Sequence, residues 1–122
     1  MDVKFYKEKE SGLVVFSLLP KEGDDNYIEL KANSIDAATE KHVPVVSIEG
    51  NKVHVEVGSI IHPMTVEHHI AFIACVTDDV VQVKYLEKTG EPKADFELAE
   101  GEKVKAVYEY CNLHGLWVKE IA

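Results

Sequence analysis

Five side chains that can bind a metal ion lie in three short blocks of the sequence. The blocks are residues 40–44, 62–68 and 111–114, and their candidate donors are His42, His62, His68, Cys111 and His114. Neutral imidazole combined with thiolate suits iron, zinc or copper. Four imidazoles and one thiolate exceed the four donors of a closed zinc site. They suit a five-coordinate iron with one position open for a small ligand, and we expect the chemistry to occur there.

The local sequence predicts where each donor lies. His42 precedes Pro44 by two residues, where the chain must be extended, so we expect it on a loop that leads into a strand. His62 belongs to a loop after the strand of residues 52–57, and His68 is predicted to begin the next strand. Cys111 and His114 are three residues apart in the turn between the last two strands, close enough for one metal to bind both.

Other residues of the same chemical types are expected to be bystanders. His54 falls on the polar phase of its strand and is predicted to be a solvated surface residue. His69 follows His68 directly and should point to the opposite face of a strand, so at most one of the two is expected to bind metal. Cys75 lies in the apolar run of residues 70–76 and Met64 beside a proline, and both are expected to pack.

Length, charge and cysteine content limit the class of protein. The chain of 122 residues suits one domain, with or without a small appendage. Thirteen basic against 22 acidic side chains give a net charge of −9, which argues against nucleic acid or an anionic membrane as a partner. A local cation must then attract any anionic substrate. Two cysteines form no disulfide framework, and no apolar run resembles a signal peptide or a membrane span, so we expect a cytoplasmic protein.

Short apolar and β-branched segments separated by turn residues predict an all-β protein. We expect strands at residues 12–19, 27–30, 45–48, 52–57, 66–77, 80–87, 94–98, 103–110 and 116–121. Only residues 34–41 have a briefly helical pattern. The seven strands from Val45 onward predict an antiparallel β-sandwich, and residues 1–36 a smaller β segment of their own.

The three blocks resemble the superoxide reductase family, which includes desulfoferrodoxin and neelaredoxin. The resemblance rests on residues 40–44 (Glu-Lys-His-Val-Pro), on His62-Pro63-Met64 with His68, and on residues 111–115 with Trp117. It extends through residues 37–122. It implies an immunoglobulin-like sandwich in which His42, His62, His68 and His114 are equatorial ligands of a mononuclear non-haem iron and Cys111 is the axial ligand.

The resemblance also implies a reaction and its partners. Superoxide would be reduced by one electron to hydrogen peroxide at one Fe²⁺/Fe³⁺ centre, with rubredoxin as the expected electron donor and a homodimer or homotetramer as the expected assembly. Lys41 would be the local cation that attracts the anion and helps to deliver a proton. Glu40 would occupy the sixth position of the resting oxidised iron.

Residues 1–36 resemble a desulforedoxin domain that lacks its metal ligands. Glu8 and Ser11 stand where the two-iron members carry a Cys-x-x-Cys pair, and the second cysteine pair is also missing. We therefore expect no Cys₄ iron centre in this segment, whose remaining role would be packing or subunit contact.

Two alternatives remain open from the sequence. The chain could be a metal-binding β-sandwich that serves as an interaction module without catalysis, carrying zinc or no metal. A dismutase is the closer enzymatic alternative, and it differs from a reductase in needing no external electron donor. Metal content distinguishes the first alternative, and dependence on a donor distinguishes the second.

Overall fold

The chain folds into two compact units. The computed structural model describes residues 3–17 and 26–121. The first unit is Met1–Lys31 and the second is Ala32–Ala122. The origin of residues 1–36 from a desulforedoxin-like domain, separate from residues 37–122, stays a prediction. No helix in the described part of the chain is long and apolar enough to cross a membrane.

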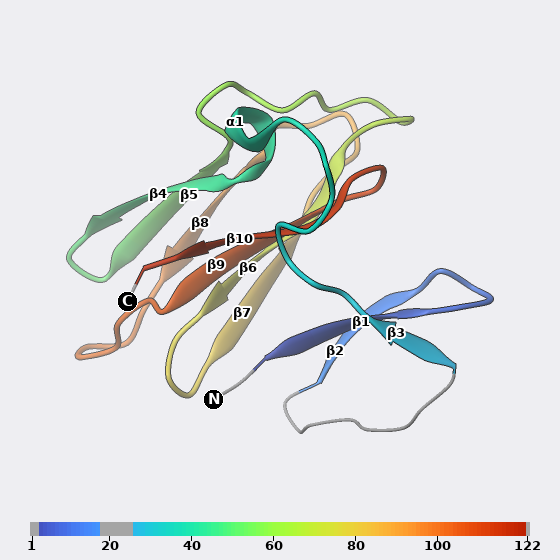
Figure 1. The fold of residues 1–122 in the computed structure, drawn as a ribbon. Coiled ribbons are helices and arrows are strands. Elements are labelled where there is room, and N and C mark those ends of the chain that lie inside the picture. The colour runs from blue at the N-terminus through green and yellow to red at the C-terminus, as the bar shows by residue number, and fades with distance from the viewer. Residues whose placement is uncertain (1–2, 18–25, 122) are drawn as a thin grey trace. The chain divides into compact units, whose positions relative to one another are not determined.

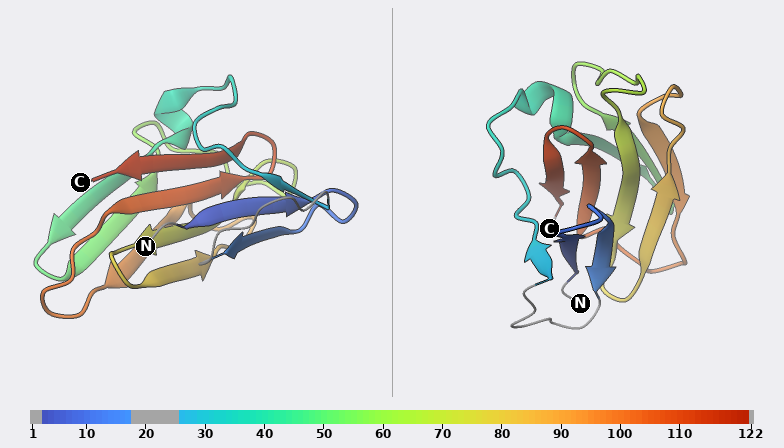
Figure 2. Two further views of the ribbon diagram at one scale, coloured as in Figure 1. Left: turned by 60° about the horizontal axis from the view of Figure 1, so that its bottom comes forward. Right: turned by 90° about the vertical axis from the view of Figure 1, so that its right-hand side faces the viewer.

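The second unit is a sandwich of two antiparallel sheets, which confirms the predicted fold class. One sheet has the order β4-β5-β8, formed by Pro44–Glu49, Lys52–Val57 and Lys93–Glu97. The other has the order β10-β9-β6-β7, formed by Gly115–Glu120, Ala106–Cys111, Ile70–Val76 and Val81–Tyr85. The two sheets can be followed as separate layers in Figures 1 and 2.

Alternation along the strands explains how the core forms. In β5, Val53, Val55 and Val57 are almost fully buried, and the residues between them face outward. In β6, nearly every residue from Ile70 to Val76 is buried. The core between the sheets also contains Phe96, Leu98, Val104, Val107 and Cys111. The buried face of each sheet therefore requires the other sheet as its cover.

One end of the sandwich carries all three ligand-bearing segments. These are the one-turn helix α1 (Thr39–His42), the loop between β5 and β6, and the turn between β9 and β10 (Figures 1 and 2). The helix predicted for residues 34–41 is shorter in the structure and covers Thr39–His42 only. His42 is the last residue of this helix and does not lie in the loop that the sequence had predicted. Pro44 begins β4 directly afterwards.

The prediction that His68 begins a strand was wrong. Thr65 N–H donates to the carbonyl of His68 at 2.9 Å, and His68 N–H donates to the hydroxyl of Thr65 at 3.0 Å. These bonds close a turn, and β6 starts only at Ile70. The apolar side chains of this run suit a strand, but hydrogen bonds between Thr65 and His68 close a turn before the strand can begin.

The first unit contains a three-stranded antiparallel sheet of order β2-β1-β3. Its strands are β1 (Lys4–Glu8), β2 (Val14–Ser17) and β3 (Tyr27–Glu29), and the rings of Phe5 and Phe16 lie 6.0 Å apart. The sequence did not predict β1, because its apolar residues are adjacent and do not alternate. The end of the predicted strand 12–19 lies outside the described residues.

Candidate metal centre

Four of the five predicted donors converge at one point. The ligand atoms of His42, His62, His68 and Cys111 all lie within 4.8 Å of one another. His42, His62 and Cys111 are at most 2% exposed, and His68 is partly buried. These residues come from the end of α1, the β5–β6 loop and the end of β9, so the fold brings together segments that are up to 69 residues apart in sequence.

His114 completes the group on its remaining side. Its Nδ1 lies 3.1 Å from Nε2 of His42 and 3.9 Å from the sulfur of Cys111. Neighbouring rings in the order 42, 62, 68, 114 and back to 42 have centroids 4.6–5.1 Å apart and meet nearly edge to face. The four imidazoles thus form a closed circuit, and the sulfur of Cys111 lies 3.5 Å from Nε2 of His62.

Backbone carbonyls orient two of the rings. Nδ1 of His42 lies 2.7 Å from the carbonyl of Ala38, and Nδ1 of His62 lies 2.6 Å from the carbonyl of Pro63. Because a carbonyl only accepts hydrogen bonds, each Nδ1 must carry the proton and donate it. Nε2 of both rings is then left as an unprotonated donor atom that faces the centre of the group, as in most metal-binding histidines.

Burial favours the neutral form of His42, His62 and His68. It lowers the pKa of His62 to about 4, and it also lowers the pKa of His42 and His68, with the neighbouring imidazoles adding to the effect. Burial raises the pKa of the Cys111 thiol, while the backbone N–H groups of Leu113 and His114 act in the opposite direction. Neutral imidazoles are the form that binds metal.

A buried nitrogen without a partner tests whether the group fits a metal ion. Nε2 of His68 is buried and has no hydrogen-bond partner in the described part of the chain. Such an atom is unfavourable unless something binds it, and its position among the other donors suits a metal ion. Four imidazoles and a thiol in one group exceed a tetrahedral zinc site and match the chemistry of iron.

Two residues outside the donor set lie against the segments that carry the rings. The indole of Trp117 stacks on His42, with centroids 4.9 Å apart and planes 24° apart, and its N–H donates to the carbonyl of His114 at 3.0 Å. Gly58 lies directly under α1, where an added Cβ would come within 2.6 Å of the carbonyl oxygen of Glu40. The sequence analysis did not identify Gly58, and only its glycine identity could have indicated a close backbone approach.

Glu40 and Lys41 lie on the exposed side of α1. The carbonyl of Glu40 accepts hydrogen bonds from Ile60 N–H and the hydroxyl of Ser59. Both side chains are exposed, and neither forms an ion pair among the described residues. The charge of Lys41 contributes to the lowered pKa of His42 and of His68, so its field reaches the group.

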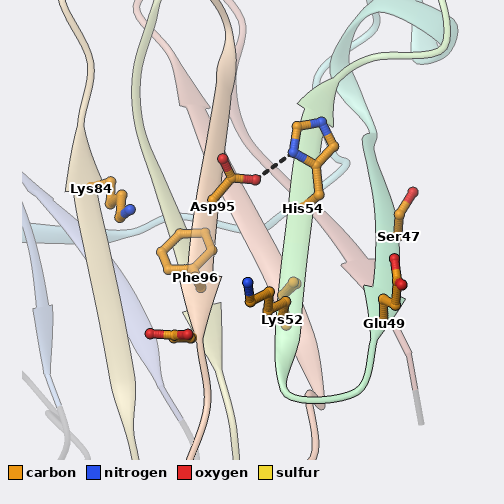
Figure 3. A pocket seen from close by; sticks show the side chains of 9 residues that line it. Ser47, Glu49, Lys52, His54, Lys84, Asp95 and Phe96 are labelled. Carbon is orange, nitrogen blue, oxygen red and sulfur yellow. Dashed lines mark hydrogen bonds and ion pairs between the residues drawn. The ribbon is translucent and has the colours of Figure 1, made fainter.

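The predicted bystanders lie apart from the group. Nδ1 of His69 faces the carbonyls of Thr65 and Val66, and burial raises the pKa of the core residue Cys75 to about 11. His54 lies on the outer face of the β4-β5-β8 sheet, where its Nδ1 is 2.5 Å from Asp95 (Figure 3). Met64 packs against the core, and its sulfur accepts the N–H of Ile70.

The sequence analysis also missed a buried carboxyl group. Glu109 on β9 is fully buried, and neither of its oxygens has a hydrogen-bond partner in the described residues. Burial raises its pKa well above the ordinary value and so favours the neutral form of the group. The sequence could have indicated this residue, because it lies two positions before Cys111 and therefore on the same face of β9.

Comparison with known proteins agrees with this geometry. The family model described as desulfoferrodoxin matches residues 34–120. A desulfoferrodoxin of Clostridium acetobutylicum is 39% identical, with 98% of each chain covered. A superoxide reductase of Pyrococcus horikoshii is 37% identical over 67% of this chain and 86% of its own. The crystal structure of the superoxide reductase from Treponema pallidum superposes with a TM-score of 0.83 at 34% identity, covering 98% of this chain and all of that one. The chain therefore belongs to the desulfoferrodoxin family.

Proposed function

We propose that this protein is a superoxide reductase, which converts superoxide, one electron and two protons into hydrogen peroxide. The observation that carries the proposal is the buried convergence of His42, His62, His68 and Cys111, with His114 closing the circuit of rings. Membership of the desulfoferrodoxin family supports it, as do relatives and solved structures named superoxide reductase.

The proposed cofactor is one mononuclear iron ion, held by His42, His62, His68, His114 and Cys111. Iron bound there would supply the one-electron redox chemistry that the reduction of superoxide requires. The neutral imidazoles add no negative charge that would repel an anion. Full burial of Cys111 keeps water from the sulfur, and the carbonyls of Ala38 and Pro63 hold two rings in orientation.

Lys41 is proposed to attract the substrate and to help in its protonation. The net charge of −9 repels an anion at long range, so a cation beside the group must reverse the potential locally. Lys41 is exposed, free of ion pairs within the described residues and adjacent to His42. Its ammonium group can also orient a water molecule that delivers a proton to the departing peroxide.

Glu40 is proposed to bind the resting oxidised centre. Hydrogen bonds from Ile60 and Ser59 fix its backbone carbonyl, while its side chain is exposed and without an ion pair in the described part of the chain. The carboxylate can therefore turn toward the centre or away from it while α1 stays in place.

We propose that an external protein, rubredoxin by family resemblance, supplies the electron. Ile60, Ile61, Val66 and Leu113 lie on the ligand-bearing loops, and each is more than half exposed. Exposed apolar residues on the loops that carry the donors suit a transient docking surface. Dimer or tetramer formation, also part of the proposal, would be measured by analytical ultracentrifugation.

Residues 1–36 are proposed to carry no metal centre. Glu8 and Ser11, which replace the cysteines of two-iron relatives, bond to each other: Ser11 N–H donates to the Glu8 carboxylate at 2.6 Å. This hydrogen bond closes the turn where a metal would otherwise be held. Deleting residues 1–31 would test a role in subunit contact, because it retains Asn33, whose side chain bonds to Val118 on β10.

The proposed activity is tested by spectroscopy and kinetics on protein produced with iron. A broad visible band that appears on oxidation and bleaches on reduction supports a thiolate-bound ferric centre. Superoxide consumption that requires an electron donor and releases no oxygen supports a reductase. Donor-independent consumption with oxygen release would indicate a dismutase, and a colourless protein containing zinc or no metal would contradict the proposal.

A further inference from the structure

His68 differs from the two buried histidines in how its ring is held. Carbonyl groups orient the rings of His42 and His62 through Nδ1. No such ring–carbonyl contact is found for His68 in the described part of the chain, and its buried Nε2 has no partner. The position of this ring therefore depends on the backbone on either side of His68 and on the neighbouring rings of His62 and His114.

Asn112 bonds to the backbone on both sides of His68. Its side-chain NH₂ donates to the carbonyl of Glu67 at 2.9 Å, and its side-chain oxygen accepts the N–H of His69 at 2.8 Å. Its own backbone N–H donates to the carbonyl of His69 at 3.2 Å. One residue thus makes three hydrogen bonds to the two neighbours of His68, although it lies more than 40 positions away in sequence.

We propose that Asn112 is a positioning residue that holds His68 in place for the metal ion. Asn112 follows Cys111 directly, so its hydrogen bonds connect the turn bearing the sulfur with the loop bearing His68. The inference rests on the metal centre of the proposed function. In a metal site, residues that orient a ligand typically account for about 10- to 100-fold in metal affinity.

The alanine variant separates the side-chain bonds from the backbone bond. Asn112→Ala removes the contacts to Glu67 O and His69 N but retains its own N–H bond to His69, so the turn can still form. We expect Co²⁺ to bind the metal-free variant about 10-fold more weakly than the wild type. The Co²⁺ absorption spectrum should shift toward that of His68→Ala, because one imidazole is no longer fixed.

Asn51→Ala is the matched control. The side chain of Asn51 donates to the carbonyl of Leu98 at 3.2 Å, beside the turn between β4 and β5, and touches none of the ligand loops. We expect this variant to bind Co²⁺ as the wild type does. Similar thermal stability of the two metal-free alanine variants would show that a general loss of an asparagine contact does not explain weaker binding.

A double-mutant cycle with His68→Ala gives the decisive test. If Asn112 acts through His68, Asn112→Ala should change Co²⁺ affinity less than 2-fold once His68 is absent. An undiminished effect in that background, or wild-type affinity of the single variant, overturns the proposal. Should Asn112→Ala fail to fold, Asn112→Asp still offers an acceptor to His69 N–H and is expected to bind Co²⁺ with intermediate affinity; wild-type affinity would again overturn it. Co²⁺ binding needs no superoxide, so failure of the reductase assay leaves this result independent.

Discussion

Histidines occur in two regions of this sandwich, and their surroundings differ in every respect that governs their chemistry. The candidate donor cluster (His42, His62, His68, His114 and Cys111) lies among loops at one end, and burial lowers the pKa of three of its imidazoles. On the outer face of the β4-β5-β8 sheet, the side chain of His54 is 43% exposed and lies between Asp95 and Glu56, which raise its pKa.

The outer face also carries a hollow, and it shows why a hollow alone does not identify a site. The hollow of about 580 Å³ is lined by Ser47, Glu49, Lys52, Val53, His54, Lys84, Asp95, Phe96 and Glu97 (Figure 3). Both ring nitrogens of His54 already face carboxylates, at 2.5 and 3.1 Å. A histidine with both nitrogens engaged forms ion pairs, whereas a buried nitrogen without a partner can bind a metal.

The largest effect is expected for the cysteine of the cluster. Cys111→Ser should abolish the thiolate charge-transfer band and lower iron affinity by more than about 100-fold. A residue that binds the metal directly should contribute at least as much affinity as the residues that orient it. Visible absorption and metal analysis measure both. Cys75→Ala is the control, because Cys75 lies in the core between the sheets. The charge-transfer band should persist in this variant. A band of unchanged position in Cys111→Ser would mean that the sulfur is not a ligand.

The next effect concerns the contact beneath α1. Gly58→Ala would place a Cβ 2.6 Å from the carbonyl of Glu40, so α1 must move, and His42 with it. We expect iron affinity to fall by about 10-fold and unfolding free energy by about 1–3 kcal/mol. Metal titration and chemical denaturation measure these changes. Gly90→Ala, which meets Glu87 in another loop, should leave iron affinity unchanged, and equal affinity losses in both variants would contradict the role of Gly58.

The candidate donors could be recognised in the sequence, whereas the contacts around them could not. His42, His62, His68, Cys111 and His114 are recognisable by residue type and by their places near strand ends. The core was also predictable, since alternation in residues 52–57 matches β5 closely. Both predictions depend on patterns among residues that lie close together in the sequence.

Contacts between distant segments leave no such pattern. Gly58 supports α1 from 18 residues away, and Asn112 bonds to residues 67 and 69, yet neither pairing is visible in the local sequence. The same limit explains the error at His68. The apolar content of residues 66–77 favoured one strand, but the hydroxyl of Thr65 and the side chain of Asn112 satisfy backbone groups before Ile70.

A smaller effect is expected for the cation beside the cluster. Lys41→Ala should lower the second-order rate of superoxide consumption by about 10-fold and flatten its dependence on ionic strength, because local attraction of the anion is lost. Pulse radiolysis over a range of salt concentrations measures both. Lys52→Ala on the outer face is the control with the same change of net charge. Equal rates in the two variants would remove Lys41 from the encounter.

The smallest effect is expected on the outer face, in stability and not in metal binding. Asp95 and then Glu56 raise the folded-state pKa of His54 above 6.5, so its protonation stabilises the fold at low pH. That contribution is fully present below the unfolded pKa and disappears as the pH rises through the folded pKa. Because the pair is exposed, we expect no more than about 0.5 kcal/mol.

The comparison of wild type with His54→Gln at two pH values isolates this contribution. Urea unfolding of the metal-free proteins should show the variant less stable at pH 5.5 and equal to the wild type near pH 9. Other titrating groups, including the cluster histidines, are common to both proteins and cancel in the difference. Iron affinity should be unchanged in His54→Gln. A loss of iron affinity in this variant would mean that His54 affects the candidate metal site, contrary to the separation of the two regions in the structure. A stability difference that grows with pH would mean that the neighbouring carboxylates do not stabilise protonated His54.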